Sequence, residues 1–202
     1  MDRAPILDGH VEKWERRYRL PPLVELDDAK PIADVYAAWN EEWLAVAFDV
    51  LKPTGVVQCD AKEWWKLDGL RVCVNTRDTP DIKRGTRFCH FFYLLPIGGG
   101  PSGKQPIAGV HRMSRAKEHP PAADATTIRH AARVRKGGYS MEAILPASCL
   151  NGWDPLEHSR IGLFYKVKDR ALPSQHLTAT DELGWNVDPS TWATAILARN
   201  DA

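Results

Sequence analysis

Tryptophan is the residue type in this sequence that points most directly to binding chemistry. The 202 residues contain eight Trp but only five Phe and five Tyr. The broad, flat indole ring is the aromatic side chain best suited to stacking on a flat ligand. Trp64 and Trp65 are adjacent, so an extended backbone would send them to opposite sides, one packed and the other facing outward. The aromatic composition therefore predicts a stacking surface.

Residue types that serve catalysis or metal binding are present, but their spacing is unfavourable. Asp181 and Glu182 are neighbours, whereas the two carboxyl groups of a glycosidase must flank the scissile bond about 5–9 Å apart. The seven His form no H-x-x-x-H pattern, and the four Cys, at positions 59, 73, 89 and 149, contain no C-x-x-C pair. We therefore expect no enzyme activity, no structural zinc and unpaired thiols.

Composition and charge exclude several classes of protein. Hydrophobic residues make up 44% and the net charge is +1, so the chain is expected to fold and to lack a global field that attracts nucleic acid or an anionic membrane. No apolar stretch approaches the ~20 residues of a membrane helix. The length fits one domain, residues 1–202. Without an apolar signal segment, the chain as given is expected in the cytoplasm, or outside the cell if a leader was removed.

Short segments of alternating hydrophobicity dominate the chain, and long helical patterns are absent. Helix signals cover only single turns near residues 12–17 and 146–150. Asn40-Glu41-Glu42 and Gly137-Gly138 have the composition of hairpin turns. The pattern predicts an all-β protein, an antiparallel β-sandwich of the jelly-roll or immunoglobulin-like kind. The expected strands cover residues 33–39, 43–50, 69–75, 87–95, 128–135, 139–145, 161–168 and 194–197.

Residues 97–124 break this pattern. The segment is rich in Gly and Pro and contains four basic residues, Lys104, Arg112, Arg115 and Lys117. Such residues are poor material for the interior of a sandwich. We expect a long Gly/Pro/basic loop insertion that packs on the surface, covers a binding face or contacts another subunit.

Five motifs occur in an order that covers nearly the whole chain. They are Leu7-Asp8-Gly9 with Trp14, Trp39-Asn40-Glu41-Glu42-Trp43 before a strand, Trp65 with Asp68-Gly69-Leu70, Gly137-Gly138-Tyr139 continuing through Glu142 to Pro146, and Trp185-Asn186-Val187-Asp188-Pro189. Together they resemble family 9 carbohydrate-binding modules and related DOMON-like β-sandwich domains. The resemblance implies a non-catalytic sandwich that holds a sugar between two Trp side chains.

The residues that match the family's aromatic clamp are Trp65 and Trp185. A sugar ring presents C–H groups on its faces, which suit an indole, and hydroxyl groups at its rim, which suit polar side chains. The family's carboxylate position on the strand after the first Trp is occupied here by Arg71. Since a guanidinium pairs with anions in a bidentate way, the carbohydrate partner is expected to be anionic, such as a uronic acid or a sulfated sugar.

Other readings of the same fold stay open. The chain could be an accessory or interaction domain that has lost sugar binding. A related sandwich family binds haem, for which Met113, Met141 and His90 could supply ligands. Family members often carry a structural calcium, and the carboxylates of Asp60, Asp68, Asp169 and Asp188 could hold one; no particular metal ligands are assigned.

Overall fold

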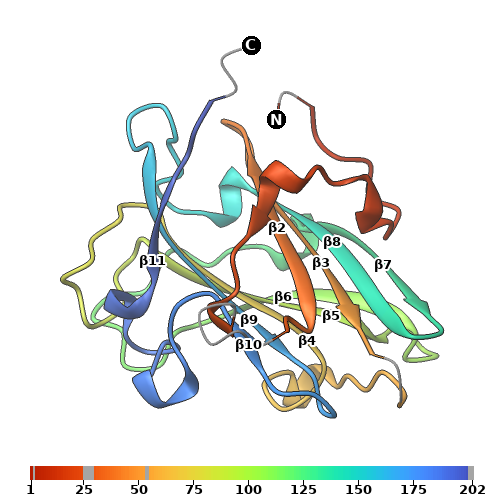
Figure 1. Ribbon diagram of the computed structural model, residues 1–202. Helices are drawn as coiled ribbons and strands as arrows, with labels where there is room; N and C mark the ends of the chain where they lie inside the picture. Colours follow the sequence, from red (N-terminus) through yellow and green to blue (C-terminus); the bar gives the residue numbers. More distant parts are fainter. Residues whose placement is uncertain (2, 25–29, 53–54, 200–202) are drawn as a thin grey trace.

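Two antiparallel sheets lie face to face in the computed structural model, which describes residues 1, 3–24, 30–52 and 55–199 (Figure 1). The first sheet has the strand order β1-β2-β3-β8-β7. Its strands are β1 (Arg19–Leu20), β2 (Ala33–Trp39), β3 (Trp43–Leu51), β8 (Gly138–Pro146) and β7 (Arg129–Arg135). The predicted all-β sandwich is confirmed.

The second sheet has the order β10-β9-β4-β5-β6, and β11 also pairs with β9. Its strands are β10 (Gln175–His176), β9 (Arg160–Lys168), β4 (Gly69–Asn75), β5 (Cys89–Gly99), β6 (Gln105–His111) and β11 (Ala193–Ile196). The helices among the described residues are 3₁₀ turns of three residues each, and none could cross a membrane. They are η1 (Val11–Lys13), η2 (Arg16–Tyr18), η4 (Ala61–Glu63), η5 (Ala125–Thr127), η6 (Ala147–Cys149), η7 (Asp181–Leu183) and η8 (Pro189–Thr191).

The main core lies between the two sheets and follows the two-residue alternation of the strands. Leu70, Val72 and Val74 of β4 point into it together with Phe48, Met141 and other buried residues of the facing sheet. The alternate residues of β4, Arg71 and Cys73 among them, point to the other side and are nevertheless buried. The outer face of the second sheet is therefore covered by other parts of the chain.

Both predicted hairpins form. In the β2–β3 turn, the side-chain oxygen of Asn40 accepts from the backbone N–H groups of Glu42 (2.8 Å) and Trp43 (3.0 Å). In the β7–β8 turn, Gly137 has a φ of +88°, a backbone conformation that favours glycine. The next residue, Gly138, lies so close to strand β3 that an added Cβ atom would fall 2.1 Å from the carbonyl oxygen of Val50.

The prediction that residues 97–124 form an irregular insertion is wrong for much of the segment. Strand β5 continues to Gly99, and β6 pairs with it, with Tyr93 opposite Gly109. Two residues that favour the loop prediction are compatible with a strand here. Pro106 lies on an edge strand, where a missing N–H is tolerated, and Gly109 leaves room for the Tyr93 ring, which would lie 2.1 Å from an added Cβ. Residues 112–124 remain mostly irregular.

The β4–β5 pairing also corrects an expected cysteine contact. Equal spacing from a turn near residue 81 predicts that Cys73 and Cys89 lie directly opposite each other. In the structure Cys73 faces Phe91, and Cys89 faces Asn75, so the register differs by two residues. The two Cys still share the outer face of the second sheet, and all four thiols are free.

Candidate functional site

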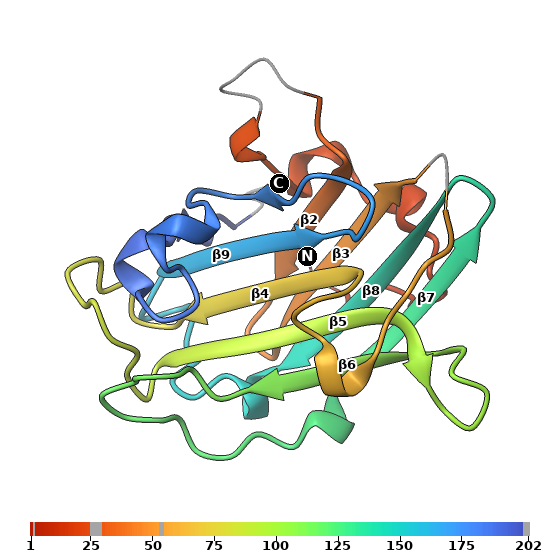
Figure 2. The same ribbon diagram turned by 90° about the horizontal axis from the view of Figure 1, so that it is seen from below.

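The outer face of the second sheet carries two cross-strand rows that differ in chemistry. In one row, Cys73 lies between Phe91 of β5 and Phe164 of β9. In the adjacent row, Arg71 lies between Tyr93 and Lys166. Figure 2 shows two connecting segments lying over this face, one containing η4 near β5 and β6, and the other following β10 near β9. The aromatic row and the polar row therefore lie beneath two loops.

The η4 segment brings Trp64 and Trp65 to this face. The Asp60 side chain caps η4 by accepting from the backbone N–H of Lys62 at 2.8 Å. The Trp64 ring stacks on Tyr93 with centroids 4.8 Å apart and an angle of 10°. Trp65 meets the Trp64 ring edge-on at 5.8 Å, and 52% of its surface is exposed. One indole is packed and its neighbour is open, as the adjacent pair predicts.

Arg71 holds this loop and does not face a ligand, which corrects the expected role of its guanidinium. The side chain points to the outer face, as the strand alternation predicts, but it is only 1% exposed. The guanidinium donates to the carbonyl oxygens of Trp64, Leu67 (2.9 Å) and Gly69 (3.0 Å). Burial lowers its pKa to about 10. The loop folds back over β4, so its carbonyl groups accept the guanidinium hydrogen bonds that an anionic sugar would otherwise accept.

Trp185 comes from the loop that follows β10, and it is 7% exposed. Its ring stacks on Phe164, with centroids 4.7 Å apart and an angle of 17°, and it contacts Phe91 at 5.5 Å. Phe91 in turn contacts Trp64 at 5.4 Å. Continuous ring contacts therefore join Trp65 to Trp185 through Trp64 and Phe91. Of the two residues matched to the clamp, Trp65 is the one with an open surface.

A polar group beside Trp185 was missed by the sequence reasoning. Asp181 accepts from the Trp185 indole N–H at 2.8 Å, and both of its carboxylate oxygens lie 2.5 Å from Lys166 Nζ. Burial disfavours the Asp181 carboxylate, but the hydrogen bonds from Lys166 and Trp185 outweigh this and lower its pKa to about 2. The Asp181 side chain is 58% exposed, so a carboxylate is available on this face from a loop.

His176 completes this polar group. It lies opposite Lys166 in the β9–β10 pairing, and its Nε2 is 3.5 Å from Asp181 Oδ1. Within the described residues, this buried nitrogen has no hydrogen-bond partner. Burial and the nearby Lys166 charge lower the His176 pKa. The only sequence signal was alternation in β9, which places Lys166 on the outer face; β10 is too short to show a pattern.

The four aspartates considered for calcium do not fit a metal site. Asp68 and Asp169 are fully buried, and Lys52 Nζ lies 2.8 Å from the first and 3.0 Å from the second. Its ammonium group thus takes the place a cation would need. Asp60 and Asp188 each accept a backbone N–H as caps of 3₁₀ turns. Across the described part of the chain, no group of three or more His, Cys, Asp or Glu is arranged to hold a metal.

The two methionines considered as haem ligands lie in separate surroundings. Met141 belongs to the core between the sheets, whereas Met113 belongs to the cluster on the outer face of the second sheet. His90 Nε2 lies 3.3 Å from the carbonyl oxygen of Asn151, and burial lowers its pKa to about 4. Met113 and Met141 are therefore separated by the second sheet and do not share a site.

Comparison with known proteins supports the fold through solved structures. No protein-family model matches the chain, and no curated protein matches it. Two structures of a family 9 carbohydrate-binding module from Caldicellulosiruptor kristjanssonii are similar to it, one in complex with cellotriose and the other with glucose. Each is 14% identical over 98% of this chain, with TM-scores of 0.67 and 0.68, and the alignments cover 92% and 94% of the module.

A third structure, a putative carbohydrate-binding protein from Bacteroides uniformis, is 13% identical, with a TM-score of 0.50 over 93% of this chain and 83% of that one. The class defined by the fold is therefore a β-sandwich resembling family 9 carbohydrate-binding modules. The structural resemblance confirms the one drawn from the sequence motifs.

Proposed function

We propose that this protein is a non-catalytic carbohydrate-binding module whose ligand stacks on Trp65. The observation that carries the proposal is the exposed Trp65 indole on the outer face of the second sheet, supported edge-on by Trp64. Trp64 is itself fixed by its stacking on Tyr93 and by the Arg71 guanidinium. An exposed aromatic ring on a fixed base can bind a sugar face with little loss of side-chain freedom.

Polar groups for the sugar rim come from both covering loops. The exposed carboxylate of Asp181 can accept from hydroxyl groups, and its partner Lys166 holds it in place. On the Trp65 side, Lys66 Nζ lies 5.9 Å from the Trp65 ring and pairs with Glu63 in an exposed ion pair. Such exposed pairs are weak, so Lys66 is free to meet an anionic sugar. Lys66 thereby takes over the role that the sequence assigned to Arg71.

The test is a calorimetric titration that measures the affinity of the protein for glucose, cellotriose and glucuronate. Trp65→Ala should weaken binding about thirtyfold, as expected for an aromatic hot spot. Ile6→Ala is the control: it removes another exposed apolar side chain, on the N-terminal segment, and should leave the affinity for all three sugars unchanged. Lys66→Gln should weaken glucuronate more than glucose. Sugar binding that survives Trp65→Ala unchanged would contradict the proposed site.

One observation favours a second candidate, an interaction domain that keeps the fold without binding sugar. The Trp185 ring is stacked on Phe164 and almost fully buried, so only one matched indole is open. In that case Trp65 would contact a protein partner. A glycan array with no saturable signal for the wild-type chain would favour this candidate.

A further inference from the structure

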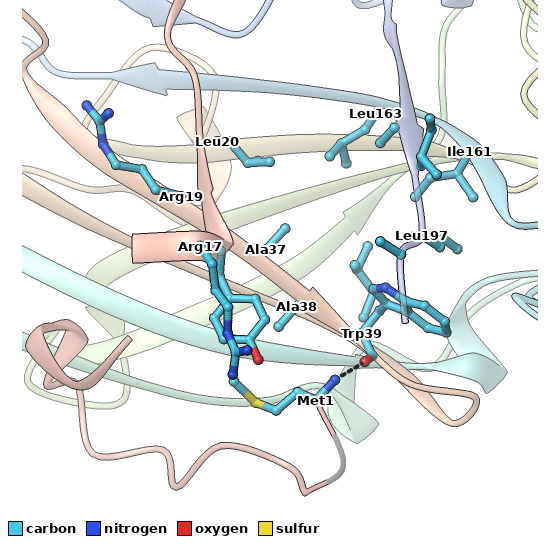
Figure 3. A pocket seen from close by; sticks show the side chains of 15 residues that line it. Met1, Arg17, Arg19, Leu20, Ala37, Ala38, Trp39, Ile161, Leu163 and Leu197 are labelled. Atoms are coloured by element: carbon cyan, nitrogen blue, oxygen red, sulfur yellow. Dashed lines mark hydrogen bonds between the residues drawn. The ribbon is translucent and has the colours of Figure 1, made fainter. Parts of the chain in front are cut away.

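A cavity of about 260 Å³ opens at the edge of the sandwich, away from the outer face that carries Trp65. It lies where β2 of the first sheet and β11 of the second sheet flank the gap between the layers (Figure 3). Strand β1 pairs with β2 only at Val35 and Tyr36. In the described part of the chain, the stretch of β2 from Ala37 to Trp39 therefore lines the cavity without a strand paired to its outer edge.

The inner wall of this edge cavity is apolar and continuous with the core. Leu44, Ile161, Leu163 and Leu197 line it, and all four belong to the main core cluster. Ala37 and Ala195 are small residues on opposite sides that leave the space open. An aliphatic or aromatic body would be well matched to this inner wall.

The charged groups of the residues that line the edge cavity are basic, and they include the amine of Met1. Among the residues that the structure describes, Arg17 and Arg19 line it, and no Asp or Glu does. Arg17 pairs with Glu15 at 2.8 Å, with both side chains more than half exposed, and Arg19 pairs with Asp34 at 2.6 Å. In Figure 3 the Arg19 guanidinium turns away from the cavity, whereas the Arg17 guanidinium lies 5.0 Å from the centroid of the Tyr18 ring, which also lines the cavity. Because the Arg17 pair is exposed, a ligand carboxylate could compete for the guanidinium.

The Trp39 indole supplies a further donor. Figure 3 shows it on the Leu197 side of the edge cavity. Among the hydrogen bonds of the described residues, none involves the Trp39 indole nitrogen, although its backbone carbonyl accepts from the Met1 amine at 3.0 Å. An indole N–H can only donate. The side-chain donors at the edge cavity, which are Trp39, the Tyr18 hydroxyl and the arginines, thus favour a ligand that accepts hydrogen bonds.

We propose that the edge cavity binds a small amphipathic carboxylate, with its apolar body against the core and its carboxylate at Arg17. The size follows from the volume: an apolar cavity of roughly 150 Å³ holds benzene, so 260 Å³ suits a chain of about eight carbons. This site is independent of the sugar site, because none of its lining residues belongs to the outer face of the second sheet.

The test uses the full chain with octanoate and 1-octanol, which share the apolar body but differ in charge. Binding is followed by the NMR signal of the Trp39 indole N–H, assigned with Trp39→Phe. Octanoate should shift this signal saturably and bind at least about tenfold more tightly than octanol, as expected for a charge-assisted contact. Arg17→Gln should remove that difference. The matched control is Arg16→Gln, because Arg16 is a neighbouring exposed arginine that does not line the cavity. This control variant should keep the preference for octanoate over octanol.

A second set of variants tests the location. Ala37→Leu should fill the cavity and abolish binding of both octanoate and octanol. If this variant no longer melts cooperatively, Ala195→Leu fills the same space from the opposite strand and replaces it. The proposal is overturned by equal affinity for octanoate and octanol, by binding that leaves the Trp39 signal unmoved, or by a folded cavity-filling variant that still binds octanoate. Trp65→Ala should leave octanoate binding intact.

Discussion

The indole nitrogen of Trp185 donates to Oδ1 of Asp181 across 2.8 Å. The same carboxylate pairs with Lys166, which projects from β9. One exposed side chain therefore connects the loop after β10 to the second sheet and sets the orientation of the Trp185 ring. Asp181 is both a candidate ligand group and a support for the loop.

Asp181→Asn tests this double role. The folded-state pKa of Asp181 is about 2, below its ordinary value of 3.8, so its carboxylate stabilises the fold above about pH 4 and loses this effect as the pH falls toward 2. The wild type should lose more stability over that window than Asp181→Asn. Melting curves between pH 2 and pH 6 measure the difference. Equal pH dependence in both proteins would show that Asp181 does not hold the loop.

Arg71→Met tests whether the guanidinium holds the loop of Trp64 and Trp65. Removal leaves three loop carbonyl groups without their donor, and the fold should lose about 2–4 kcal/mol. Urea unfolding measures the loss, and hydrogen exchange should increase in residues 60–68. Arg160→Met is the control, because that arginine is exposed and forms one ion pair. Unchanged exchange in the loop would contradict the assigned role.

Lys52→Met should be strongly destabilising, because it leaves the buried carboxylates of Asp68 and Asp169 without a counter-charge. Loss of one member of a buried ionic group costs about 3–5 kcal/mol. Lys66→Met removes an exposed pair and should stay within about 0.5 kcal/mol. Urea unfolding at pH 7 compares the two. A small effect of Lys52→Met would mean that the buried carboxylates find other partners.

The sequence was most informative where a motif reflects a packing requirement. Leu7-Asp8-Gly9 and Glu142 belong to different motifs, yet the backbone N–H of Gly9 donates to Glu142 at 2.8 Å, and the Trp14 indole N–H donates to the same carboxylate at 2.8 Å. These motifs attach the N-terminal segment to the first sheet. They carry the fold resemblance through these packing contacts.

The sequence was least informative about contacts between distant loops and strands. Alternation places Arg71 and Lys166 on the outer face correctly, but nothing local indicates that one meets loop carbonyls and the other meets Asp181. Strand β6 was missed for a related reason. Its Pro106 and Gly109 are poor strand formers in isolation, and only the edge position and the Tyr93 ring make them suitable.

The adjacent residues Trp64 and Trp65 allow a matched test of support against binding. Trp64→Ala removes the ring stacked on Tyr93 and in contact with Phe91, so it should cost about 2–3 kcal/mol of stability. Trp65→Ala removes an exposed ring and should change stability by about 0.5 kcal/mol or less. Urea unfolding measures stability, and glucose titration measures binding. We expect Trp64→Ala to lower both stability and glucose affinity, because the Trp65 ring loses the ring that supports it. We expect Trp65→Ala to lower glucose affinity alone. The reverse order of stabilities would show that Trp65 is the packed ring.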